Sequence, residues 1–171
     1  MFTIDKVTVS YDTEEDRLHL AVSDAQQQPL GLWLTRRLAN QLIGVLLGEL
    51  AESEAGQTDA HVRTAVQAWE QAAANAQLKP QTPVRSDAVL SNCLVTSVDV
   101  MHADGHVGLV FQLRESRPAA LTLSHTALRQ WLGIVHKLYG KAEWPCDGLW
   151  PDWMTGESNF VPSAIAAGTR H

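Results

Sequence analysis

The sequence predicts an α+β fold built from two β-β-β-α units whose corresponding positions lie 89 residues apart. Two pairs of segments carry this prediction: residues 29–35 (PLGLWLT) match 118–124 (PAALTLS), and 41–46 (QLIGVL) match 130–135 (QWLGIV). At this offset the apolar residues also fall at the same positions within each expected strand and helix, and the alignment needs no gap. We therefore expect a duplicated unit, with one or two antiparallel sheets packed by two equivalent helices.

The first unit begins with two strands joined by a polar turn. Residues 4–11 alternate between apolar and polar side chains, residues 12–16 are acidic, and residues 18–22 alternate again. After a second turn, residues 30–34 form a third short strand. Thr35 is a suitable N-cap for a helix at about 36–52, because its hydroxyl can accept a hydrogen bond from a free amide of the first turn.

The second unit repeats this order. Its strands are expected around residues 96–100, 107–111 and 121–123, and Asp104-Gly105 is a typical hairpin turn between the first two. Ser124 corresponds to Thr35 and caps the second helix. We expect this helix to reach about Tyr139 and to stop at Gly140.

Each predicted helix carries a glycine at the same place, Gly44 in the first and Gly133 in the second. Glycine inside a helix costs about 1 kcal/mol relative to alanine. Because this cost occurs twice, we expect both glycines to mark places where another element approaches closely.

Two segments depart from the repeat. Thr58 or Asp59 could cap a helix that runs from Ala60 to about Leu78. Its thin apolar stripe should face the sheet or a partner: Val62, Val66, Trp69 and Ala73. Prolines then form a linker. The predicted organisation is unit 1 at 1–52, insertion and linker at 53–88, unit 2 at 89–140, and an irregular Trp-rich tail at 141–171, all in one compact domain.

Charge and composition exclude several classes of function. The net charge is −6 and the pI is about 5.6, which argues against duplex nucleic acid and against a polybasic membrane anchor. No signal peptide or membrane-spanning run is apparent, so we expect a cytoplasmic protein with Cys93 and Cys146 as free thiols. No cofactor is expected.

Few residues suggest catalysis or metal binding. His102, Asp104 and His106 share one hairpin tip and form a weak candidate for a metal site, since such side chains often splay into water. No nucleophile elbow, phosphate loop or dinucleotide motif is present. An enzyme or small-ligand site between the units, using His125 and Cys93, is one alternative, although a non-catalytic protein is the better prediction.

The candidate binding residues are aromatic and basic. Trp33 should point away from the leucines of its strand, either covered by the inserted helix or tail or open to a partner, and Arg36 and Arg37 follow it in the first helical turn. The tail adds Trp144, Trp150 and Trp153. We expect a protein-interaction or assembly module, including self-association. The alternative is single-strand nucleic-acid binding through Trp33, Arg36 and Arg37.

The predicted layout broadly resembles the duplicated sheet-plus-helix arrangement of PUR-type and Whirly single-strand nucleic-acid binders. Those proteins have four strands per unit, whereas three are expected here. The resemblance concerns architecture alone, and no residue role is carried over from it.

Overall fold

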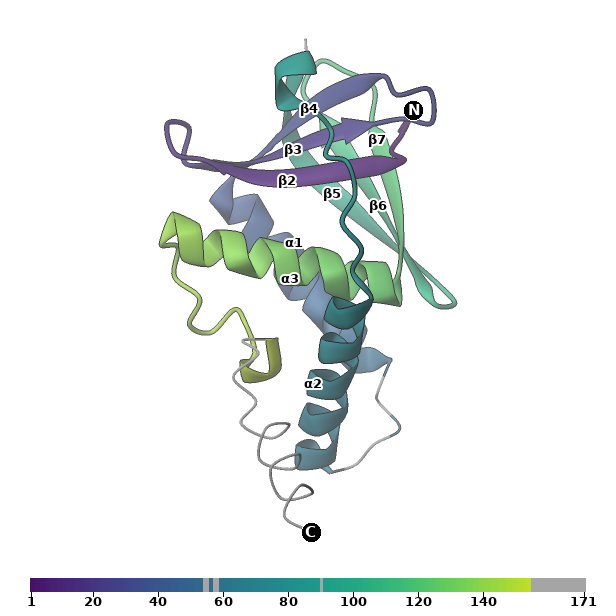
Figure 1. Ribbon diagram of the computed structural model, residues 1–171, viewed down its shortest axis with the longest axis vertical. Helices are drawn as coiled ribbons and strands as arrows, with labels where there is room; N and C mark the ends of the chain where they lie inside the picture. The colour runs from purple at the N-terminus through teal and green to yellow at the C-terminus, as the bar shows by residue number, and fades with distance from the viewer. Residues whose placement is uncertain (54–55, 57–58, 90, 155–171) are drawn as a thin grey trace.

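The computed structural model describes residues 1–53, 56, 59–89 and 91–154 (Figure 1). Over these residues it has three α-helices, two short 3-10 helices and a seven-stranded mixed sheet, so the predicted α+β class is confirmed. The elements in chain order are β1 (Phe2–Thr3), β2 (Lys6–Asp12), β3 (Arg17–Ser23), β4 (Pro29–Leu34), α1 (Arg36–Glu52), α2 (Ala60–Gln77), η1 (Ser86–Ala88), β5 (Asn92–Ala103), β6 (His106–Leu113), β7 (Ala119–Ser124), α3 (His125–Ala142) and η2 (Asp152–Met154).

The sheet is mixed, which corrects the expectation of antiparallel pairing alone. Its strand order is β1-β7-β6-β5-β4-β3-β2. The pairs β2–β3, β3–β4, β5–β6 and β6–β7 are antiparallel, whereas β4–β5 and β1–β7 are parallel. The β4–β5 pair can be parallel because α1 and α2 supply the long crossover connection that parallel neighbours require.

The two ends of this sheet meet. β1 and β2 stand at opposite ends of the strand order, yet only Ile4 and Asp5 separate them in the chain. The amide of Ile4 donates to the carbonyl of Ala120 in β7, and the next amide, of Asp5, donates to the carbonyl of Ser23 in β3. The sheet therefore curls round on itself, and one continuous N-terminal segment joins both units.

Several strand registers agree with the offset of 89. In the antiparallel pairs, adding 89 to both residues of Leu20–Leu32 gives Leu109–Leu121. In the parallel pairs the two units exchange roles: adding 89 to Thr3 and subtracting 89 from Ala120 turns the pair Thr3–Ala120 into Asn92–Gly31. The order β-β-β-α also occurs twice. These geometries fit two related units, while the duplication of the sequence itself stays a prediction.

The offset of 89 does not hold for the strand register of the first hairpin in the two units. Val9 lies opposite Leu20, but Val98 lies opposite Phe111, which is two residues further along than the offset requires. β5 has an irregularity between Val95 and Ser97, and its hairpin turn is shorter than that between β2 and β3. An inserted residue of this kind bends a strand and increases its local twist.

The helix starts follow the sequence prediction, but one helix end does not. Thr35 Oγ1 accepts from the amide of Leu38, and Ser124 Oγ accepts from the amide of Ala127, as N-caps do. α3 continues past Gly140 to Ala142 and ends at Glu143, whose positive φ of 56° closes the helix. The predicted stop at Gly140 is therefore wrong.

The core lies where α1 and α3 pack against the curled sheet. Figure 1 shows the sheet at one end of the molecule, α1 and α3 crossing below it, and α2 pointing away from it. α1 packs on β3 and β5, and α3 packs on β2, β6 and β7. Fully buried side chains include Leu18, Leu20, Leu32, Ile43, Leu46, Leu109, Phe111, Leu128, Leu132 and Tyr139.

Candidate protein-interaction site

The inserted helix α2 turns a polar face toward the protein. It packs against α3 and η2, and its fully buried positions are Gln67, Gln71 and Ala74. Buried glutamine side chains need hydrogen-bond partners, because an unpaired amide loses its hydration without compensation. The packing of α2 therefore depends on polar contacts supplied by other elements.

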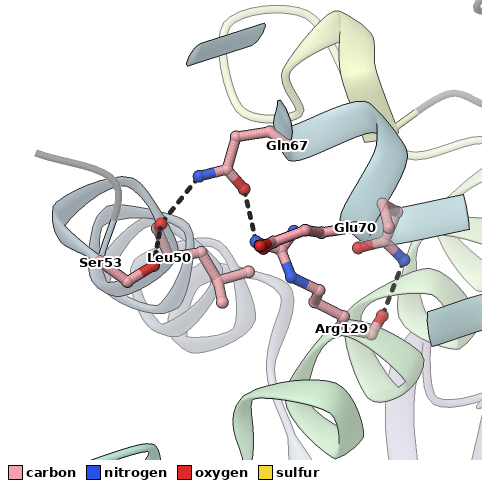
Figure 2. A network of polar contacts seen from close by, with 6 residues as sticks. Leu50, Ser53, Gln67, Glu70 and Arg129 are labelled. Carbon is pink, nitrogen blue, oxygen red and sulfur yellow. Dashed lines mark hydrogen bonds and ion pairs between the residues drawn. The ribbon is translucent and has the colours of Figure 1, made fainter. Parts of the chain in front are cut away.

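Arg129 of α3 supplies most of these contacts (Figure 2). Its side chain is 3 % exposed, and Nη2 donates to Gln67 Oε1 at 2.7 Å and to Glu70 Oε2 at 2.6 Å. Gln71 Nε2 returns a hydrogen bond to the Arg129 carbonyl at 2.9 Å. Such charge-assisted contacts offset the cost of burying a guanidinium.

The same network reaches the end of α1. Gln67 Nε2 donates to the carbonyl of Leu50 at 2.8 Å, and Ser53 Oγ donates to that carbonyl at 2.7 Å (Figure 2). The last carbonyls of a helix have no partner within it, so these bonds satisfy one of them. One buried polar cluster thus fixes α2 against both α1 and α3.

The opposite face of α2 is apolar and exposed. At 100° per residue, five exposed positions fall on the side away from the buried glutamines: Val62, Ala65, Trp69, Ala72 and Ala76. We call this set the outer stripe. Trp69 is 69 % exposed and Val62 is 42 % exposed. The only charged residues of α2, Arg63 and Glu70, are both half-buried.

The polarity of α2 is therefore the reverse of that expected for a surface helix, which buries its apolar stripe. The sequence predicted that Val62, Val66, Trp69 and Ala73 would face the sheet or a partner. Val66 and Ala73 are half-buried, but Trp69 does not face the sheet. The sequence reasoning missed the buried glutamines, although two glutamines four residues apart lie on one helix face.

The two helix glycines have different surroundings. A Cβ at Gly133 would lie 3.1 Å from Asn75 Oδ1 and 3.3 Å from Gln71 Nε2, so α2 makes the close approach predicted there. At Gly44, a Cβ would meet no atom of another described element within 4 Å, so the predicted close approach is absent among the residues that the structure describes. The exposed face of α1 around Gly44 includes Val45, which is 48 % exposed.

Trp33 and the two arginines have local contacts. Trp33 is half-buried, and its ring packs on His19 at a centroid distance of 4.5 Å; His19 Nε2 lies 2.7 Å from Asn92 Oδ1. Arg36 and Arg37 are exposed in the first turn of α1. α2 packs on α3 and η2, which corrects the expectation that the inserted helix could cover Trp33.

Two of the three tail tryptophans are buried within this chain. Trp144 and Trp150 pack edge-on against Tyr139, and Trp144 Nε1 donates to Asp16 Oδ1 at 2.8 Å. Trp153 is half-buried, with the Arg129 guanidinium 5.7 Å from its ring centre. The predicted binding roles of Trp144 and Trp150 do not fit this placement, because both rings complete the core.

The contacts of Trp144 also affect a carboxyl group. Hydrogen bonds from Trp144 and Tyr11 hold the pKa of Asp16 below its usual value, and the positive charge of Arg36 contributes further. Tyr11 donates to Asp16 Oδ1 at 2.8 Å. Asp16 lies in the turn between β2 and β3, so its hydrogen bond from Trp144 connects the segment after α3 to the first hairpin. Arg36 thereby makes a small electrostatic contribution at this exposed turn.

The hairpin histidines do not converge on a metal site. His102 Nδ1 lies 2.5 Å from Glu49 Oε2 of α1, while His106 Nδ1 lies 3.2 Å from the carbonyl of Asp104. Among the described residues, no group of three or more His, Cys, Asp or Glu is arranged to hold a metal ion. The weak candidate formed by His102, Asp104 and His106 is thus not assembled.

A groove does lie between the two units, but it lacks the residues proposed for chemistry. It has a volume of about 720 Å³ and runs between β2, residues 78–83, β7 and α3. Lys6, Thr8, Pro80, Leu121 and Trp131 are among its lining residues, and neither His125 nor Cys93 lines it. His125 Nε2 instead lies 3.8 Å from Glu49 Oε1, and both cysteines are free thiols.

Comparison with known proteins gives no functional assignment. No protein-family model, no curated protein and no solved structure matches this chain. None of the helices within the described ranges is both long and apolar enough to span a membrane.

Proposed function

We propose that this protein is a non-catalytic interaction module that binds a protein partner through the outer stripe of α2. One observation carries the proposal: a helix held by buried polar contacts presents Trp69, 69 % exposed, on its apolar outward face. Tryptophan is enriched at protein interfaces, where it contributes large amounts of binding energy.

The polar attachment of α2 supports this proposal. Ala-rich helices are locally stable, but an isolated helix of this length is marginal in water, so α2 depends on the Arg129 network for its position. The network fixes the outer stripe relative to α1 and α3 without using any apolar residue of that stripe. A fixed apolar face loses less entropy on binding than a mobile one.

Single-strand nucleic-acid binding is less well supported. Trp33 already packs on His19, and Arg36 lies close enough to Asp16 to lower its pKa, after the larger effects of Trp144 and Tyr11. The chain also carries a net charge of −6, which opposes association with a polyanion.

Site-specific photo-crosslinking in cells can test the proposal. A photoreactive amino acid at Ala72, in the outer stripe, should give discrete products of higher mass, and adding Trp69→Lys should abolish them. The matched control places the same group at Gln26, an exposed turn residue between β3 and β4. Equal products from Ala72 and Gln26, or no product from Ala72, would overturn the proposal.

A further inference from the structure

We infer that the partner of the outer stripe is a second copy of this chain, bound with the two α2 helices antiparallel. This inference rests on the proposed function, because it names the partner of the same surface. Three features of the stripe carry it: its lack of charge, the distribution of large and small residues along it, and the area that it can bury.

The first feature is electrostatic. A surface that meets an identical copy of itself must be neutral or self-complementary, since like charges placed opposite one another are destabilising. No Asp, Glu, Lys or Arg lies in the outer stripe, and the two charged residues of α2 are turned inward. The net charge of −6 then resides elsewhere, so added salt should slightly favour association by screening it.

The second feature is the spacing of side-chain volumes. The stripe has one large residue, Trp69, and its next member along the helix is Ala72. In an antiparallel pair that sets Trp69 of each copy opposite Ala72 of the other, Ala65 lies opposite Ala76. Each large ring then fills the space above a small residue, as close packing requires. A parallel pair would set the two Trp69 rings against each other and leave the alanine layers underfilled.

Helix electrostatics favours the same direction. The partial charges at the two ends of one helix lie beside the opposite ends of its antiparallel neighbour. α2 also points away from the sheet (Figure 1). All five residues of its outer stripe are exposed.

The third feature sets the expected strength. With Trp69 opposite Ala72, residues 64–77 of the two helices overlap over about 21 Å, and this overlap buries roughly 500–700 Å² in total. This area is below that of a permanent dimer. The inference is therefore a weak, reversible dimer with a dissociation constant on the order of 10–100 µM.

Sedimentation velocity of the purified full-length chain over increasing concentration tests this inference. The wild-type protein should shift from monomer to dimer, and higher salt should not weaken the shift. Trp69→Ala should raise the dissociation constant by about tenfold or more. Because Trp69 is exposed, the thermal unfolding of this variant should match the wild type. Met101→Ala removes an exposed apolar residue of β5 and should leave dimerisation unchanged.

An exchange of residues tests the antiparallel register. Ala72→Trp alone sets Trp against Trp in two layers and should weaken the dimer. The double variant Trp69→Ala/Ala72→Trp restores one Trp opposite one Ala in each layer, so its dissociation constant should return to within about threefold of the wild type. A double variant no better than either single variant would overturn the inference.

The crosslinking experiment separates this inference from the proposed function. A Trp69-dependent product with the mass of two chains supports both. A product containing a different protein, together with a strictly monomeric purified chain, overturns the self-association and retains the interaction module. A crosslink mapped to residues 155–171 of the same chain overturns both.

Discussion

α1 and α3 occupy equivalent places in the two units, but within the described part of the chain α2 packs along α3 and touches α1 near its C-terminal end, at the Leu50 carbonyl. α2 lies against Gly133 of α3, whereas the corresponding Gly44 of α1 faces open space. The residue that attaches α2 also differs between the units, because Arg129 corresponds to Asn40, which accepts a hydrogen bond from Tyr139 at 2.6 Å. Two units of similar backbone thus have different surfaces.

This difference shows how one inserted helix can break an internal symmetry. The chain carries a single α2, and its polar face matches the Arg129 side of α3. The apolar stripe that remains on α2, and the bare face of α1, both result from this one-sided attachment. The surfaces that we connect with function lie where the units differ, while the equivalent positions maintain the fold.

The largest expected effect comes from removing the buried guanidinium. Arg129→Ala leaves Gln67 and the partly exposed Glu70 without their shared donor and should lower the free energy of unfolding by about 2–3 kcal/mol. Asn40→Ala, the matched change in the first unit, should cost only about 1 kcal/mol, because a single hydrogen bond is lost. Urea unfolding measures both. Equal losses would contradict the asymmetry of the two units.

A smaller effect is expected at the two glycines. Gly44→Ala should stabilise the protein by about 0.5–1 kcal/mol, since alanine favours the helix and its Cβ meets nothing. Gly133→Ala should give no such gain, because its Cβ presses on Gln71 and Asn75 and disturbs the bond from Gln71 to the Arg129 carbonyl. The changes in Tm that the two substitutions cause should differ in sign or clearly in size. The same increase in Tm for both would show that α2 does not constrain α3.

The smallest effect is a pH dependence just below neutrality, which arises from a histidine of the second unit. Burial lowers the pKa of His136, which lies beside Trp150, whereas the corresponding residue of α1 is Leu47. A lowered folded pKa means that the unfolded chain binds the proton more readily. The free energy of unfolding should therefore have its full value above the ordinary pKa of 6.5 and decline as the pH falls below 6.5. His136→Leu should remove this decline in urea unfolding at acidic pH.

An NMR titration of the His136 ring protons checks the cause directly. The midpoint should lie below 6.5 in the folded protein. A midpoint at or above that value would mean that burial does not control this group, and the acid-dependent loss of stability would then need another origin.

Local patterns predicted most of the secondary structure. The alternation in residues 4–11 and 18–22, the Asp104-Gly105 turn and the caps Thr35 and Ser124 all correspond to observed features. These features depend on neighbours within a few residues, so the sequence contains the relevant information. β1 was missed because its two residues pair with β7, more than a hundred residues away.

The candidate site was predictable only in part. The periodicity of α2 identified Trp69 as a member of an apolar stripe. It did not reveal which face of α2 packs against the rest of the protein. The buried side is chosen by Arg129, about 60 residues later, because its guanidinium needs the oxygens of Gln67 and Glu70. A helical pattern cannot reveal such a partner.

The sequence by itself thus determined every strand except β1, the helix starts and the α+β class, because these follow from propensity, periodicity and capping. The tertiary structure decided which strands are parallel, how the two ends of the sheet meet, and which face of α2 remains exposed. Those features depend on long-range hydrogen bonds and on the need of each buried polar group for a partner, and neither is a local property. The same requirement that buries Gln67 and Gln71 leaves Trp69 facing outward.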